Sequence, residues 1–124
     1  MPDSKKRNAI DRTAIQKIRE LEHPDCPDLL QTLIEMFFVS VRTELKLLHE
    51  AGERGQWEAV PRIAHGLKAS AATLGAQQVA SLLAKMEKAV WKELGPQEFR
   101  RQLQQIESAT TEAICALENI KIAS

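Results

Sequence analysis

The sequence predicts an all-α domain: an antiparallel up-down-up-down four-helix bundle with a short extra helix at its N-terminal end. Apolar residues recur every three or four positions through four long segments, which is the spacing of a helix that buries one face. Glycine and proline stand at the breaks between these segments, and the connections are short, so consecutive helices are expected to run antiparallel. The apolar residues are mainly Leu, Ile, Ala and Val, which also favours helices.

Length and charge limit the classes of function. A chain of 124 residues is long enough for one domain with a single core and too short for two. The 17 basic and 17 acidic residues balance, so no overall field attracts nucleic acid or an anionic membrane. No run of about 18 apolar residues and no signal-peptide segment is present. Cys26 and Cys115 lack metal-ligand spacing and are interpreted as incidental thiols of a cytoplasmic protein.

The N-terminal region is expected to form a tail and then a short helix. Residues 1–8 are polar and aperiodic, so we predict a flexible tail, followed by a single domain over residues 9–124. Asp11 can cap a helix whose apolar positions are Ala14, Ile15, Ile18 and Leu21. Two prolines, Pro24 and Pro27, end that helix. The initial methionine and the polar tail favour a free-standing module over a fragment of a larger protein.

Two further helices follow in the central part of the chain. The first is predicted from about Asp28 to between Gly52 and Gly55, glycines that favour a helix end. Its core positions are Leu29, Leu30, Leu33, Ile34, Met36, Phe37, Phe38, Val41, Leu45 and Leu48. The second begins near Trp57, has Pro61 in its first turn and ends at Gly75. Its inward positions are Val60, Ile63, Leu67, either Ser70 or Ala71, and Leu74.

The C-terminal part contains the last two predicted helices. One runs from about Ala76 to Leu94, and its inward positions are Val79, Leu82, Leu83, Met86 and Val90. Gly95 and Pro96 then break the chain and open the next helix. The last helix has a narrow apolar seam of Phe99, Leu103, Ile106, Thr110, Ala113, Leu117 and Ile120. Such a seam can be satisfied inside one bundle, so we expect a monomer.

His65 is predicted to point away from the core. It lies two residues from both Ile63 and Leu67, which is roughly 160–200° around the helix from either inward position. Two cations, Arg62 and Lys68, flank it on the helical surface. An uncovered imidazole between cations favours a histidine that handles an anion.

Small residues surround His65 on the same helix. They are Gly66, Ala69 and Ala72, so little side chain covers the imidazole. A glycine inside a helix costs roughly 1 kcal/mol relative to alanine, which indicates that a partner approaches closely there. Ser70 is interpreted as a packing residue.

The same stretch resembles the signature of histidine-containing phosphotransfer (HPt) domains. Residues 64–76 read A-H-G-L-K-A-S-A-A-T-L-G-A, and Met86-Glu87 follow on the next predicted helix. The family pattern is roughly A-H-x-L-K-G-S-A-x-x-L-G-A, followed by a leucine-glutamate pair. Ala69 stands where the family usually has glycine, and alanine still leaves the imidazole uncovered.

The resemblance implies that His65 carries a phosphoryl group. Its Nε2 would accept the group from the aspartyl-phosphate of a response-regulator receiver domain and pass it to another receiver. A hybrid sensor kinase is a further partner of this kind. Lys68 would act as a counter-charge, and Arg62, Gly66, Ala69 and Ala72 would form the docking face. The sequence has no P-loop, so the chain is expected to be a phosphocarrier without kinase activity of its own. It is expected to bind no cofactor, and the receiver domain would supply Mg²⁺.

Glu87 is a candidate partner of His65. It lies twelve residues after Gly75 and His65 lies ten before it, so both stand some 15–18 Å from the turn at about 1.5 Å per residue. A hydrogen bond from one ring N–H to Glu87 would fix the tautomer and leave the other nitrogen exposed. The alternative is a solvated carboxylate at the rim. Trp91, one turn later, is assigned to a docking surface, although a core position is equally compatible.

Other classes of function remain as alternatives. The same bundle could be a non-catalytic helical adaptor that binds signalling proteins, with His65 incidental. An inhibitory relative that only binds a kinase is disfavoured by the intact histidine. A metal-binding bundle needs inward-facing pairs such as Glu-x-x-His, and none is present. His23 and His49 have no partner at metal-ligand spacing, so no metal site is predicted.

Overall fold

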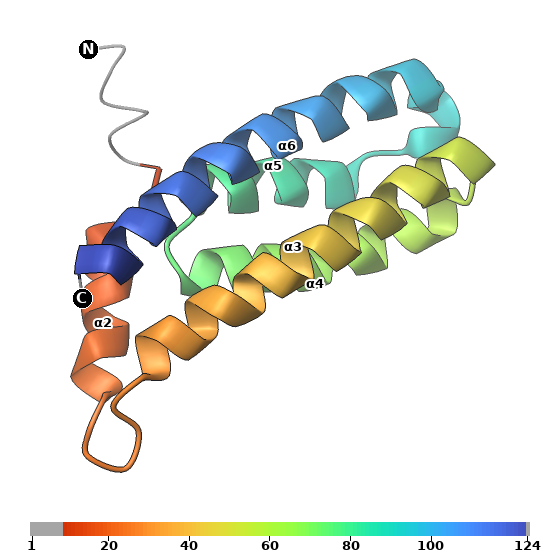
Figure 1. The fold of residues 1–124 in the computed structure, drawn as a ribbon. Helices are drawn as coiled ribbons and strands as arrows, with labels where there is room; N and C mark the ends of the chain where they lie inside the picture. Colours follow the sequence, from red (N-terminus) through yellow and green to blue (C-terminus); the bar gives the residue numbers. More distant parts are fainter. Residues whose placement is uncertain (1–8, 124) are drawn as a thin grey trace, which may run out of the picture.

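The computed structural model describes residues 9–123. The secondary-structure elements in that range are all helices. Four helices form the bundle: α3 (Leu29–Arg54), α4 (Val60–Thr73), α5 (Gln77–Lys88) and α6 (Trp91–Ala123). A shorter helix, α2 (Arg12–Leu21), lies across one end of the bundle (Figure 1). The all-helical bundle with an extra N-terminal helix is therefore confirmed. The predicted tail, residues 1–8, lies outside the described residues.

The four long helices surround one core. α4 contacts α3 and α5, and α6 contacts the same two helices from the other side. Figure 1 shows the chain running along α3, returning along α4, and repeating this course through α5 and α6. The core positions predicted for the last helix are all buried: Phe99, Leu103, Ile106, Thr110, Ala113, Leu117 and Ile120. Burial of this continuous apolar seam is what holds α6 between its two neighbours.

Helix ends follow the predicted chemistry at four places. The Asp11 side chain accepts a hydrogen bond from the Thr13 amide at 2.9 Å and caps α2. Gly55 (φ 66°), directly after α3, and Gly75 (φ 77°), two residues after the end of α4, adopt the left-handed conformation. Pro61 lies at the start of α4, after a single 3₁₀ turn, η1 (Trp57–Ala59). Two of these ends, at Pro61 and Gly75, set the length of α4, the helix that carries His65.

The predicted helix over Ala76–Leu94 is wrong at its C-terminal end. α5 stops at Lys88, because Ala89 is extended (ψ 147°), and a separate helical turn begins at Trp91. The Trp91 indole N–H donates to the carbonyl of Met86 at 3.0 Å, satisfying an acceptor at the end of α5. Gly95 (φ 83°, ψ 174°) then separates this turn from the rest of α6, at the predicted break.

Three positions assigned to the apolar face are not in the core. Met36 is 59% exposed, Val90 is 56% exposed and Leu21 is 67% exposed. Met36 precedes the fully buried Phe37, and one step along a helix turns a side chain by about 100°, away from the core. Val90 lies in the extended link between α5 and α6, so the helical spacing that predicted its burial no longer applies.

Gly52 allows α3 to approach α6, and Gly52→Ala is expected to lower the free energy of unfolding by about 2 kcal/mol. An added Cβ would lie 2.6 Å from Cδ2 of Phe99 and closer still to Cε2. That ring is held between Trp57 and Trp91, at centroid distances of 5.4 and 5.1 Å, so it has no room to move. Urea denaturation followed by circular dichroism measures the change. A variant as stable as wild type would show that the two helices can separate freely.

Candidate functional site

His65 stands on the outer face of α4. The inward face of this helix, Val60, Ala64, Leu67 and Ala71, is buried and fixes the helix against the core. The His65 side chain is 65% exposed. The prediction that its imidazole lies outside the core is confirmed by this placement.

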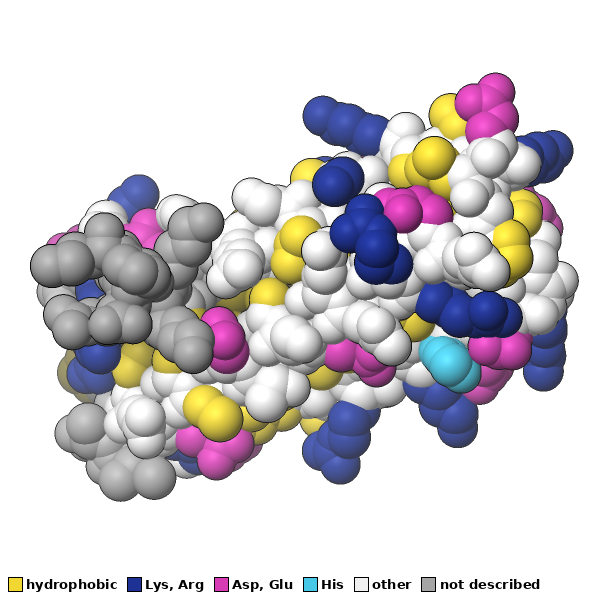
Figure 2. All heavy atoms as spheres, turned by 90° about the horizontal axis from the view of Figure 1, so that it is seen from above, with side chains coloured by type: hydrophobic (Ala, Val, Ile, Leu, Met, Phe, Trp, Pro, Cys, Tyr) yellow, Lys and Arg dark blue, Asp and Glu magenta, His cyan; other side chains and the backbone are white. Residues whose placement is uncertain are grey.

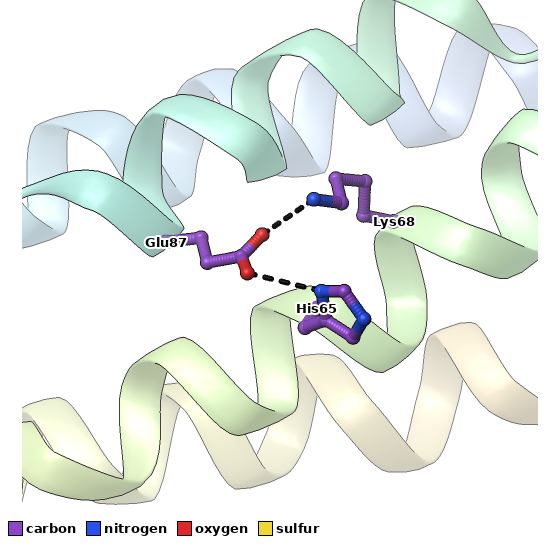
Figure 3. A network of polar contacts seen from close by, with 3 residues as sticks. All are labelled: His65, Lys68 and Glu87. Atoms are coloured by element: carbon purple, nitrogen blue, oxygen red, sulfur yellow. Dashed lines mark hydrogen bonds and ion pairs between the residues drawn. The ribbon is translucent and has the colours of Figure 1, made fainter.

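Glu87 reaches from α5 to both His65 and Lys68 of α4 (Figure 3). Its Oε2 lies 3.0 Å from Nδ1 of His65, and its Oε1 lies 2.6 Å from Nζ of Lys68. The structure therefore favours the direct Glu87–His65 contact over the solvated rim carboxylate. The chain turns between the two helices at Gly75, which places Glu87 at the level of His65.

The charge of Glu87 determines which ring nitrogen carries the proton. The hydrogen bond from Lys68, followed by that from His65, lowers the pKa of the Glu87 carboxyl below its ordinary value, although partial burial opposes this. An ionised carboxylate has no proton to donate, so Nδ1 of the neutral ring must be the donor. The lone pair then lies on Nε2, on the side of the ring away from Glu87 (Figure 3). Nε2 has no hydrogen-bond partner within residues 9–123.

The predicted docking residues on α4 lie on the surface beside His65. Arg62, Gly66, Ala69 and Ala72 are all exposed. A Cβ added at Gly66 would meet nothing within 4 Å, so this glycine serves no internal contact. The residues around the imidazole are thus small or extend into solvent, which leaves space for a partner.

The two cations that flank His65 in the sequence differ in their surroundings. Lys68 is half-buried and bound to Glu87, whereas Arg62 is exposed and makes no ion pair within the described chain. Lys68 therefore acts on the imidazole through the carboxylate in this structure. Its predicted role as a counter-charge to phosphate remains a prediction.

Trp91 does not belong to a docking surface. It is 3% exposed, and its ring packs against Trp57 and Phe99. The assignment of Trp91 to the partner face is corrected for this reason, and the core position is the observed one. The prediction assumed that one continuous helix carries Glu87 and Trp91 one turn apart. It is wrong because α5 ends at Lys88, between the two residues.

In the part of the chain that the structure describes, His, Cys, Asp and Glu side chains do not form a second candidate site. Over residues 9–123, no group of three or more His, Cys, Asp or Glu side chains is placed to hold a metal ion. Within the same range, no helix has both the length and the apolar content needed to cross a bilayer. Figure 2 shows basic and acidic side chains intermixed on one face, with apolar atoms in small separate groups.

Gly66→Ala is expected to raise the free energy of unfolding by up to about 1 kcal/mol, because alanine is the better helix former. No packing penalty offsets this gain, since the new methyl group projects into open space. Urea denaturation monitored by circular dichroism measures it. A loss of stability would mean that Gly66 has an internal role, contrary to its interpretation as part of an open face.

The comparisons with known proteins give one finding. A family model described as "Hpt domain" matches residues 32–119, which is more than half of the chain and includes the three residues of Figure 3. Neither a curated protein nor a solved structure gives a match.

Proposed function

This chain belongs to the Hpt domain family, and on that basis we propose that it is a histidine phosphotransfer protein of a two-component phosphorelay. In this role Nε2 of His65 accepts a phosphoryl group from the aspartyl-phosphate of one receiver domain and passes it to another. A cytoplasmic setting and receivers as partners are part of the proposal. The observation that carries it is an exposed imidazole whose Nδ1 is held by Glu87 while Nε2 is open.

The transfer step follows from the tautomer. The Nε2 lone pair attacks phosphorus, the bond between phosphorus and the aspartyl oxygen breaks, and the aspartate leaves as a carboxylate. The product ring carries a proton on Nδ1 and a phosphoryl group on Nε2, so it is positively charged. The Glu87 carboxylate, 3.0 Å from Nδ1, stabilises this charge. The same contacts serve the reverse step, in which a second aspartate takes the group.

The receiver is expected to supply Mg²⁺ and most of the stabilisation of the phosphoryl oxygens. This chain supplies the nucleophile, the carboxylate that orients it and a surface for docking. Lys68 has two tasks in this proposal: its hydrogen bond holds the Glu87 carboxylate in position beside His65, and its ammonium adds positive charge near the incoming phosphate.

Lys68→Met is expected to slow transfer about tenfold without unfolding the bundle, because one charge-assisted contact is lost. Lys68 is the largest cause of the low pKa of Glu87, so that pKa should rise toward its ordinary value. Phosphotransfer reactions quenched at a series of times give the rate, and NMR titration of the Glu87 carboxyl gives its pKa. Lys17→Met, at an exposed position on α2, is the matched control. An unchanged rate would remove Lys68 from the mechanism.

The direct test of the proposal maps the phosphorylated atom. The wild-type chain is incubated with a panel of receiver domains charged with acetyl phosphate, and an acid-labile label is expected on the protein. Phosphorus–nitrogen correlation by NMR should place the group on Nε2 of His65. A non-catalytic adaptor would acquire no label from any receiver, and label on another residue would also overturn the proposal.

A further inference from the structure

Glu87 lies in the last turn of α5, one residue before the helix ends at Lys88. The carbonyls of a last turn have no partner within the helix, so other groups must satisfy them if the turn is to keep its shape. The Ala89 amide donates to the Met86 carbonyl at 3.4 Å, which is a long hydrogen bond. The position of Glu87 therefore depends on what else binds the end of α5.

The indole of Trp91 supplies a second, shorter hydrogen bond at this end. Its Nε1–H donates to the Met86 carbonyl at 3.0 Å. That carbonyl belongs to the peptide bond that joins Met86 to Glu87, and the Met86 side chain is fully buried. The residue before Glu87 is thus held both by its carbonyl and by its side chain. This fixes the backbone from which the Glu87 side chain extends.

Packing holds the indole itself in place. Trp91 is buried, and its ring centroid lies 5.1 Å from that of Phe99 and 6.3 Å from that of Trp57. Phe99 belongs to α6 and Trp57 to the turn η1 before α4, and Figure 1 shows the start of α4 and the α5–α6 link at the same end of the bundle. The N–H donor is therefore fixed relative to α6 and to the start of α4, and not only to α5.

The contacts of Glu87 with α4 leave little room for movement. One carboxylate oxygen lies 3.0 Å from Nδ1 of His65 while the other lies 2.6 Å from Nζ of Lys68 (Figure 3). Because the carboxylate bridges two partners, it cannot turn toward one without leaving the other. A displacement of the Glu87 backbone by about 1 Å is enough to lengthen either contact beyond hydrogen-bond range.

We propose that Trp91 is a positioning residue for phosphoryl transfer: its indole N–H fixes the peptide bond before Glu87, and Glu87 in turn keeps the lone pair of His65 on Nε2. The inference rests on the proposed function of His65. Trp91 touches none of the reacting atoms and acts through Glu87. Its loss is therefore expected to slow the chemical step without weakening the binding of the phosphoryl donor.

The test compares Trp91→Phe with Trp57→Phe. Both variants keep an aromatic ring, but only Trp91→Phe removes a donor, since the Trp57 side chain makes no hydrogen bond within residues 9–123. For Trp91→Phe, kcat for transfer from a charged receiver should fall about fivefold with KM unchanged, because one hydrogen bond is lost. Labelling by phosphoramidate, a small donor that needs no docking surface, should fall by the same factor. Trp57→Phe should leave both rates near their wild-type values.

Two NMR measurements separate positioning from a general loss of stability. In Trp91→Phe the pKa of the Glu87 carboxyl should rise toward its ordinary value, because hydrogen bonds from Lys68 and His65 lower it in the wild type. Nitrogen spectra of the His65 ring should show a mixture of the two neutral tautomers instead of the Nδ1–H form alone. Trp57→Phe should change neither quantity.

A double-mutant cycle tests whether Trp91 acts through Glu87. In Glu87→Ala protein, Trp91→Phe should slow transfer no further, because the carboxylate that the indole positions is already absent. Effects of the two substitutions that multiply would show that Trp91 acts by another route and would overturn the inference.

A closer replacement removes the donor and keeps the size of the ring. The chain has two tryptophans, so Trp91 is the single one in Trp57→Phe protein. Incorporation of benzothienylalanine there puts sulfur in place of the indole N–H, the only polar group of that ring. The Glu87 pKa and the His65 tautomer should change as described for Trp91→Phe, whether or not Trp91→Phe itself folds.

The outcomes distinguish this inference from the proposed function. If neither phosphoramidate nor any receiver labels the wild type at His65, the proposed function fails. If the wild type is labelled, and loss of the Trp91 N–H changes neither the rate nor the Glu87 pKa and the His65 tautomer, only the positioning inference fails. A rise in KM with kcat unchanged would also overturn it.

Discussion

His65→Gln is expected to abolish labelling by charged receiver domains, a loss of about a thousandfold or more in rate, because the nucleophile itself is removed. The glutamine amide nitrogen has no available lone pair, although the side chain keeps much of the volume and polarity of histidine. The position is exposed, so the free energy of unfolding should change by no more than about 0.5 kcal/mol. Transfer assays at matched receiver concentration, with thermal denaturation of each protein, measure both quantities.

His49→Gln is the matched control for this variant. The His49 side chain is 64% exposed, close to the 65% of His65, and it also lies near a carboxylate, Glu53, at 3.9 Å. That distance is too long for a hydrogen bond, so His49 lacks the fixed tautomer of His65. We expect His49→Gln to transfer at the wild-type rate. Label that persists in His65→Gln, or that disappears in His49→Gln, would contradict the assignment of the phosphoacceptor.

Much of this site could be predicted from the sequence because it depends on helical geometry alone. The exposure of His65 follows from its angle to Ile63 and Leu67, and the level of Glu87 follows from counting residues on either side of Gly75. Neither inference needs knowledge of the rest of the bundle. The shared contact of Lys68 with Glu87 was not predicted, because it depends on a side-chain rotamer across two helices.

The errors arise where a tertiary contact overrides the helical period. Trp91 was placed on the surface by a spacing that assumes a continuous helix, whereas its indole binds the Met86 carbonyl and ends that helix.

Gly75→Ala is expected to lower the free energy of unfolding by about 3 kcal/mol, because two penalties act at this position. The residue has φ 77°, a conformation that strains an L side chain. An added Cβ would also lie 2.7 Å from the Asp11 carbonyl oxygen and 3.0 Å from the Ala14 Cβ. The Asp11 amide donates to the Gly75 carbonyl at 2.8 Å, so this clash would push α2 away from the turn that joins α4 and α5. Urea denaturation gives the change.

Gly55→Ala separates the two penalties. Gly55 has a similar φ of 66° but nothing within 4 Å of an added Cβ, so only the conformational strain of about 1 kcal/mol should be seen. A larger loss at Gly75 would then measure the packing of α2 against the α4–α5 turn. That turn holds Glu87 at the level of His65, so Gly75→Ala should also weaken the Nδ1 contact and raise the pKa of Glu87. Equal losses for the two variants, with an unchanged pKa, would show that α2 has no part in positioning the site.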